Sequence, residues 1–175
     1  MANEVSKRKN SSPWVTGLSW AAAAGAGWWA WQQLHASSGP SFRIRSRQPE
    51  TALVTGASSG IGAVFARRLA ALGYDLVLVA RRQERLDDLA AEVSGGYGVH
   101  TEVLVADLAE PAGLATVNER VAHAGNLSVL VNNAGFGTGK GFLQVDAEVH
   151  ERMIRLHDCA TVRLTRTALP AMCER

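Results

Sequence analysis

The residues with the clearest chemical use form the segment TGASSGIG at 55–62, directly after a short apolar run. Glycines let a chain turn sharply and approach a ligand with no Cβ in the way. A helix that begins near Ile61 points its unpaired N–H groups at the same place, and the serine hydroxyls add further donors. This pattern predicts a turn that binds a pyrophosphate. Its candidate binding residues are Gly56, Ser58, Ser59, Gly60, Ile61 and Gly62.

Two arginines stand at the end of the next apolar run. A site for NAD usually has an acid there, which binds the ribose 2′-hydroxyl. This chain instead has Ala80 followed by Arg81 and Arg82. A guanidinium suits a 2′-phosphate, so the pattern predicts NADP as the cofactor. The alternative is a pair of exposed arginines at the start of a helix.

Two more polar segments follow in order along the chain. Asp107 and Leu108 come after the third apolar run and form an edge suited to adenine, although Asp107 would equally cap the helix that Pro111 begins. The fourth run ends in small residues that let the backbone lie against a cofactor. This ordered set favours a dinucleotide site over a glycine-rich loop without a ligand. The candidates in the last segment are Asn133, Ala134 and Gly135.

The apolar pattern predicts the elements that position these residues. Strands are expected at 51–55, 75–80, 101–105 and 128–131. Helices are expected at 61–72, at 82–93 with Gly95 and Gly96 ending it, from Pro111, and from an N-cap at Asp146 towards Leu169. The alternation predicts an α/β fold with a doubly wound, parallel sheet of about four strands. The first helix has apolar residues at helical spacing, namely Ile61, Val64, Phe65, Leu69 and Leu72.

The N-terminal region has a different composition. No Asp, Glu, Lys or Arg occurs from Asn10 to Phe42, and all five tryptophans fall between Trp14 and Trp31. The mostly apolar stretch 14–34 has about the length that crosses a hydrocarbon core. Tryptophans near both of its ends suit the two membrane interfaces. Three interpretations compete: an apolar helix that anchors the chain in a membrane, which we favour, a cleaved signal peptide, and a disordered or surface-packed leader.

These patterns divide the chain into a leader at 1–40, a linker at 41–50 and a dinucleotide-binding domain at 51–175. With the anchor, we expect membrane association with the nucleotide domain facing the cytoplasm, and a cytoplasmic protein otherwise. The net charge of +2 includes no basic stripe, so no nucleic-acid partner is expected. Cys159 and Cys173 have no CxxC spacing and no histidine cluster, so we expect two partly buried thiols and no metal site.

Taken together, TGASSGIG, VARR, ADL, VNNAG and LTRTALPAM resemble the short-chain dehydrogenase/reductase family, from about Thr51 to Arg175. The resemblance implies a Rossmann-like fold that binds NADP(H). It places the 55–62 turn on the pyrophosphate, Arg81 on the 2′-phosphate, and Asp107 and Leu108 beside adenine. Residues 133–135 would line the adenosine ribose and the approach to the nicotinamide. Family members often form homodimers through the helices that 146–175 represents, and their substrates include small carbonyls, alcohols and lipid-like molecules.

The family's catalytic residues are a Ser and a Tyr-x-x-x-Lys pair, and this sequence does not contain them. Its tyrosines, Tyr74 and Tyr97, fall in the nucleotide-binding half, and His157 stands where the family has an Asn that supports a water relay. We therefore expect the NADP-binding portion of a carbonyl/alcohol oxidoreductase, truncated and inactive alone. The alternative is a non-catalytic dinucleotide-binding or interaction module, possessing the same turn and attached to a membrane.

Overall fold

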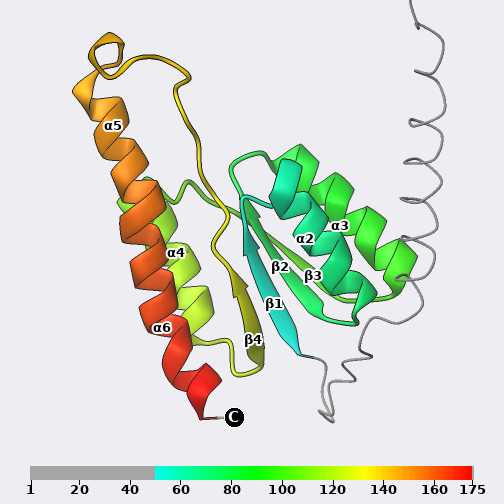
Figure 1. The fold of residues 1–175 in the computed structure, drawn as a ribbon. Helices are drawn as coiled ribbons and strands as arrows, with labels where there is room; N and C mark the ends of the chain where they lie inside the picture. Colours follow the sequence, from blue (N-terminus) through cyan, green and yellow to red (C-terminus); the bar gives the residue numbers. More distant parts are fainter. Residues whose placement is uncertain (1–49, 175) are drawn as a thin grey trace, which may run out of the picture. The chain divides into compact units, whose positions relative to one another are not determined.

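The computed structural model describes residues 50–174, and the predicted leader and most of the linker lie outside them. The described residues form an α/β domain, as predicted (Figure 1). Its elements are β1 (Thr51–Thr55), α2 (Gly60–Ala71), β2 (Asp75–Ala80), α3 (Gln83–Tyr97), β3 (Thr101–Val105), α4 (Pro111–Ala122), β4 (Leu127–Val131), the 3₁₀ turn η1 (Phe142–Gln144), α5 (Ala147–Ile154), the π-helical segment η2 (Arg155–Ala160) and α6 (Thr161–Cys173).

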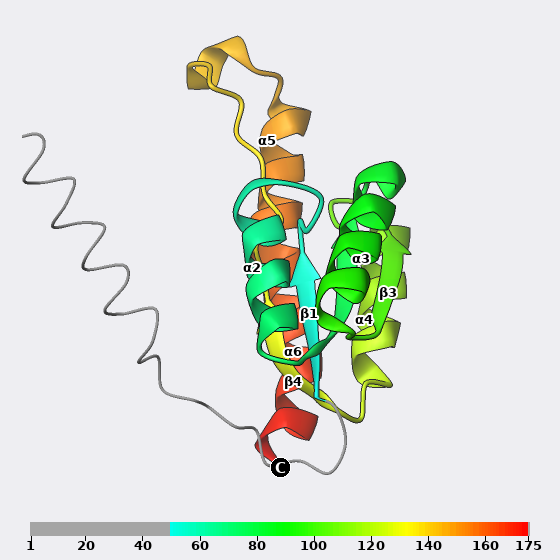
Figure 2. The same ribbon diagram turned by 90° about the vertical axis from the view of Figure 1, so that its right-hand side faces the viewer.

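The sheet is parallel, with strand order β3-β2-β1-β4. Helices α2 and α3 cover one face, and α4 and α6 cover the other, as the two views in Figures 1 and 2 agree. The strand order reverses beside β1. Strands β2 and β3 follow one another on one side of β1, and β4 then pairs with the opposite side of β1. Ligands of such sheets bind outside the carboxyl ends of the strands at this reversal. The fold therefore brings the ends of β1, β2 and β4 to one place.

One cluster of the hydrophobic core lies between the sheet and the helices α4 and α6. Leu53, Val77 and Val79 project from the two central strands, and Val117 and Leu164 are among the helical residues that pack against them. All of these side chains are buried, which agrees with the unbroken aliphatic runs expected for strands covered on both faces. The strands β1, β2 and β3 begin and end where the sequence predicts, and β4 begins one residue earlier.

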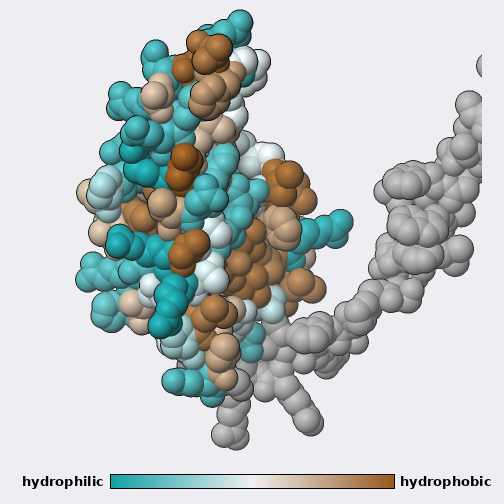
Figure 3. All heavy atoms as spheres, turned by 60° about the vertical axis from the view of Figure 1, so that its left-hand side comes forward, coloured by the Kyte–Doolittle hydropathy of each residue, from teal (hydrophilic) through white to brown (hydrophobic). Residues whose placement is uncertain are grey.

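The packing of α2 differs from what its apolar residues suggest. The helix buries a row of small residues, Gly62, Ala63, Ala66 and Ala70, together with Leu69. Small side chains let the helix approach the sheet closely. The large apolar side chains that remain exposed include Ile61, Val64, Phe65 and Leu72, and Figure 3 shows apolar surface gathered in a patch on one face of the domain.

Three further expectations need correction. Helix α3 continues through Gly95 and Gly96 and ends at Tyr97. Gly98 follows with a φ of +70° and forms a left-handed C-cap, donating its N–H to the carbonyl of Ser94. The long helix after Asp146 is not uniform, because η2 interrupts it with wider turns. Both cysteines are exposed rather than partly buried.

Within residues 50–174, no helix combines the length and the apolar character needed to cross a bilayer.

Side-chain hydrogen bonds join the end of β1 to the chain that leaves β4. The buried Thr55 hydroxyl donates to the carbonyl of Val131 at 3.2 Å. The same oxygen accepts the backbone N–H groups of Asn133 at 2.9 Å and Ala134 at 3.0 Å. One hydroxyl thus satisfies three backbone groups at a point where the ladder between β1 and β4 ends, and it holds the loop after β4 against the glycine turn.

Thr55→Val preserves the shape of this side chain but removes the acceptor of two N–H groups. We expect it to lower the free energy of unfolding by about 2 kcal/mol, since unsatisfied donors keep their desolvation penalty. Thr55→Ser retains the hydroxyl and loses one methyl, which costs about 1 kcal/mol. Urea unfolding of the three proteins measures both changes, and a Ser variant less stable than the Val variant would contradict this role.

A second side-chain contact joins α2 to α3. Arg67 donates two hydrogen bonds of 2.7 Å to the carboxylate of Glu92, and both side chains are about half exposed. The hydrogen bond from Arg67 holds the pKa of Glu92 below its ordinary value of 4.5. A carboxyl group whose pKa is lowered by folding stabilises the protein above its ordinary pKa, and the stabilisation disappears as pH falls through the lowered value.

Glu92→Gln is therefore expected to reduce stability at neutral pH, with a difference from the unmodified protein that shrinks as the pH falls below about 4.5. Unfolding curves collected across the acid range measure this difference. A difference that stays constant across that range would show that the ion pair is not its cause.

Candidate functional site

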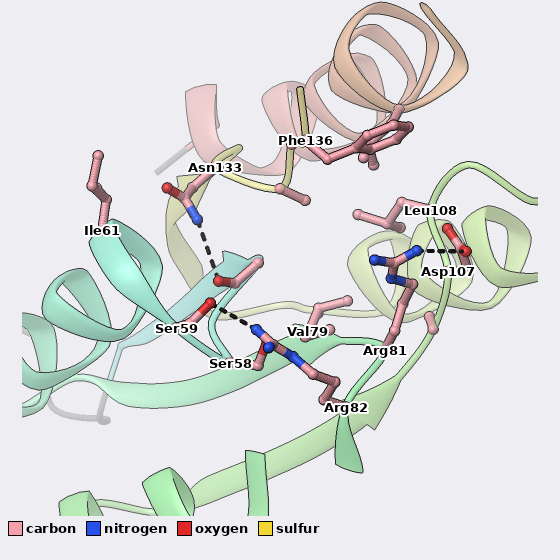
Figure 4. A pocket seen from close by; sticks show the side chains of 16 residues that line it. Ser58, Ser59, Ile61, Val79, Arg81, Arg82, Asp107, Leu108, Asn133 and Phe136 are labelled. Carbon is pink, nitrogen blue, oxygen red and sulfur yellow. Dashed lines mark hydrogen bonds and ion pairs between the residues drawn. The ribbon is translucent and has the colours of Figure 1, made fainter. Parts of the chain in front are cut away.

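A cavity of about 300 Å³ opens at the carboxyl ends of the strands, beside β1 where the strand order reverses. Figure 4 shows its lining, which comes from the turn after β1 and from the ends of β2, β3 and β4. Every predicted cofactor-binding residue lines it except Gly60 and Gly62. The lining residues that were not predicted to bind a cofactor are Val79, Ala80, Ala106, Phe136 and Leu156.

The glycine turn is shaped by the residues that follow β4. Gly56 has a φ of +68°, and a Cβ on it would stand 2.7 Å from the Nδ2 atom of Asn133. A Cβ on Gly62 would stand 2.5 Å from the same atom and would also meet the carbonyl oxygen of Gly56. Gly62 therefore permits the close approach of α2 to the loop, although it does not line the cavity. Gly60 has a φ of +56° and begins α2.

The start of α2 leaves donors for a ligand. Its N-cap residue, Ser59, makes no capping hydrogen bond through its side chain. The first N–H groups of a helix have no partner within the helix, and the dipole places partial positive charge on them. This helix start lies at the cavity mouth, because Ser59 and Ile61 both line the cavity. The geometry suits a phosphate or another anion.

The two neighbouring arginines point in different directions (Figure 4). Arg82 turns towards the glycine turn, where its Nη2 atom lies 2.7 Å from the Oγ atom of Ser59 and 3.0 Å from that of Ser58. Arg81 turns towards the end of β3, where its Nη1 atom lies 3.5 Å from the Oδ2 atom of Asp107. Both line the cavity. One guanidinium and two hydroxyls thus form a donor cluster, while the other guanidinium faces a carboxylate.

Asp107 has a different structural role from the helix cap considered above. The N-cap of α4 is Glu110, and the Oδ1 atom of Asp107 accepts the N–H of Ala109 at 3.0 Å within the loop. Its Oδ2 atom accepts a hydrogen bond of 2.9 Å from the Nη2 atom of Arg152. Arg152 comes from α5, 45 residues along the chain. No local pattern indicates this pair, because it arises from packing between distant elements.

The first part of the loop after β4 is held at two points. Asn133 donates from Nδ2 to the carbonyl of Thr55 at 2.9 Å. The N–H of Phe136 donates to the Nε2 atom of His157 at 3.1 Å, and the two rings meet edge to face. An imidazole that accepts at Nε2 carries its proton on Nδ1. A Cβ at Gly135 would stand 3.0 Å from that Nε2 atom, so the histidine lies directly against the loop.

His157 therefore positions the segment that lines the cavity but does not itself line it. It lies in η2, at the step where the helix widens. Leu156, the residue before it, does reach the cavity. Among the described residues, no three His, Cys, Asp or Glu side chains gather as a metal site requires.

Comparisons with known proteins identify relatives of this domain. The family model described as short chain dehydrogenase matches residues 50–175. A very-long-chain 3-oxoacyl-CoA reductase from Anas platyrhynchos is 34% identical over 128 residues, which cover 71% of this chain and 41% of that protein.

Two solved structures show the same fold. A short-chain dehydrogenase from Sphingobium yanoikuyae in complex with NADPH has a TM-score of 0.69 and 47% identity, covering 71% of this chain and 49% of that one. The L-sorbose reductase from Gluconobacter frateurii, complexed with NADPH and L-sorbose, has a TM-score of 0.67 and 36% identity, covering 73% of this chain and 49% of that one. The chain thus spans about half the length of these relatives, or less.

The close contact of Gly62 with the Gly56 carbonyl and the Asn133 amide can be tested by substitution. Gly62→Ala places a methyl group against backbone and an amide that cannot withdraw, so we expect a loss of about 3 kcal/mol in unfolding free energy. Gly95→Ala is the matched control, because a Cβ there meets nothing within 4 Å in the exposed part of α3. Alanine favours a helix over glycine by about 0.5–1 kcal/mol, so this variant is expected to be slightly more stable. Equal effects of the two substitutions in urea unfolding would contradict the close approach.

Proposed function

The chain belongs to the short-chain dehydrogenase family, and on that premise we propose that residues 50–174 bind NADP(H) as the cofactor-binding part of a carbonyl/alcohol oxidoreductase. The observation that carries the proposal is the donor cluster at the cavity mouth, where Arg82, Ser58 and Ser59 meet the start of α2. Phosphates are recognised by such combinations of guanidinium, hydroxyl and helix N–H donors.

The residues present fit a dinucleotide phosphate. The turn lines the cavity with Gly56, Ser58, Ser59 and Ile61, so a ligand there meets its backbone and its two hydroxyl groups. Leu108 and Val79 offer apolar surface deeper in the cavity, suited to a base or a ribose ring. Arg81 and Arg82 supply two positive charges for a 2′-phosphate, and no carboxylate at the end of β2 takes the place of the ribose-binding acid.

Bound NADPH supplies the hydride in such an enzyme. The structural relatives are described with NADPH bound, and two of the proteins above are named as reductases, which supports reduction of a carbonyl group. The oxoacyl substrate named for one relative and the sugar named for the other differ greatly in size and polarity. We therefore propose the reaction class, with a small carbonyl or a lipid-like carbonyl as substrate.

The proton donor of that reaction is not among the described residues that line the cavity. Tyr74 directly precedes β2 and Tyr97 ends α3, so both lie at the opposite end of the sheet from the cavity. Residues 50–174 would accordingly bind the cofactor and orient it, without delivering a proton. We propose that the 175-residue chain alone binds NADPH and shows no measurable carbonyl reduction. A non-catalytic dinucleotide-binding module would behave in the same way.

We also propose that residues 14–34 attach the protein to a membrane, with the nucleotide domain on the cytoplasmic side. This segment lies outside the described residues, and the support is its composition: a stretch free of charged residues, tryptophans near both ends and basic residues on both flanks. Cell fractionation of the full chain and of a variant without residues 1–40 tests the anchor. A full chain that stays in the soluble fraction contradicts it.

The cofactor proposal is tested by titrating the full chain with NADPH and NADH and following quenching or energy transfer in fluorescence. We expect NADPH to bind more tightly, and Arg82→Met or Arg81→Met to weaken NADPH by about tenfold with little effect on NADH, since a charge-assisted bond contributes roughly 1.5–3 kcal/mol. Arg68→Met, an exposed arginine of α2 outside the cavity, is the matched control. Equal affinity for the two cofactors would exclude the proposed specificity.

A further inference from the structure

Two arginines share one oxygen of Asp107. The Oδ2 atom lies 2.9 Å from the Nη2 atom of Arg152 and 3.5 Å from the Nη1 atom of Arg81. Arg81 lines the cavity, whereas Arg152 approaches the carboxylate from α5 and is not among the lining residues. From this arrangement, and resting on the proposed function, we propose that Arg152 is a positioning residue that sets the preference for NADP(H). It does so by neutralising Asp107 and thereby releasing Arg81 for the 2′-phosphate.

The two ion pairs are unequal. The Arg152 side chain is 33% exposed and also lies 3.6 Å from Glu110 through its Nη1 atom, so two carboxylates hold it. The Arg81 side chain is 63% exposed, and its pair with Asp107 is longer. Exposed ion pairs contribute little, because water screens the charges and the side chains lose freedom on pairing. Arg81 can therefore leave Asp107 while Arg152 remains bound to it.

The carboxylate matters because it faces the same cavity as the donors. Asp107 lines the cavity together with Arg81 and Arg82, so an incoming 2′-phosphate meets one negative charge near two positive ones. Without Arg152, that carboxylate would hold Arg81 more strongly and repel the phosphate. NADH has an uncharged hydroxyl in place of this phosphate, and a hydroxyl can donate a hydrogen bond to a carboxylate. Loss of Arg152 is thus expected to penalise NADPH selectively.

The experiment measures the dissociation constants of NADPH and NADH for the full chain and for Arg152→Met. We expect NADPH to bind about tenfold more weakly, an effect within the usual range of coupling between two sites. The dissociation constant of NADH is expected to change by less than about twofold. Arg155→Met is the matched control, since it removes an arginine three residues further along, at the start of η2, whose ion-pair partner is Glu151 of α5. This control is expected to leave both constants unchanged.

A double-substitution cycle tests the route through Asp107. In an Asp107→Asn background the charge that Arg152 neutralises is gone, so adding Arg152→Met is expected to change the ratio of the two affinities by less than about twofold. Arg152→Lys, which retains the charge, is expected to retain most of the NADPH preference. If Arg152 had only a structural role, Arg152→Met would weaken the binding of both cofactors equally. It would also do so in the Asp107→Asn background, and this result would overturn the inference.

Two further outcomes are decisive. If Arg152→Met does not fold, Asp107→Asn alone still tests the proposal: removing the carboxylate is expected to preserve or raise the preference for NADPH, and a lowered preference overturns the role assigned to Arg152. Failure of the cofactor proposal looks different, because the unmodified chain would then show no preference for NADPH. A preference that is present in the unmodified chain and survives in Arg152→Met contradicts only the inference about Arg152.

Discussion

The buried hydroxyl of Thr55 connects two strands that are far apart in the sequence and adjacent in the sheet. It satisfies a carbonyl of β4 and two N–H groups of the loop beyond, and the Asn133 amide returns a hydrogen bond to the carbonyl of Thr55. Buried backbone groups require partners, so these contacts determine where the loop runs. The loop in turn occupies the space that a side chain at Gly56 or Gly62 would need. The shape of the glycine turn is therefore a consequence of this contact as much as of any ligand.

Charge in the cavity follows from the same convergence of strand ends. Arg81 and Arg82 are neighbours in the chain, yet one faces a carboxylate from the end of β3 and the other faces the serines after β1. A parallel sheet brings the carboxyl ends of its strands to one edge, so residues from three separate loops meet there. Asp107 would be an unfavourable neighbour for a phosphate by itself. Its pairing with Arg152 changes the electrostatic character of the cavity without adding a residue to its wall.

Much of the fold and most of the cavity lining could be predicted, and the reason lies in particular residues. Aliphatic runs such as 75–80 define strands with clear ends, and each candidate segment directly follows such a run. Once the sheet is parallel, those segments must meet. The end of α3 was predicted wrongly, because glycine disfavours a helix only weakly and the left-handed cap at Gly98 stabilises a later end. Phe136 and Leu156 were missed because neither belongs to a motif, although each is next to a residue that was singled out.

The sequence by itself determined the periodicity of each element, the order of the binding segments and the absence of an acid after β2, because these depend on the local chain. Only the tertiary structure decided which face of α2 is buried: its spacing predicts a helix, yet the small residues face the sheet while Val64 and Phe65 are exposed. It likewise decided that His157 binds the loop through the N–H of Phe136 and that Arg152 pairs with Asp107. Such contacts join elements distant in sequence, and they depend on how the helices pack onto the sheet rather than on the spacing of residues within any one of them.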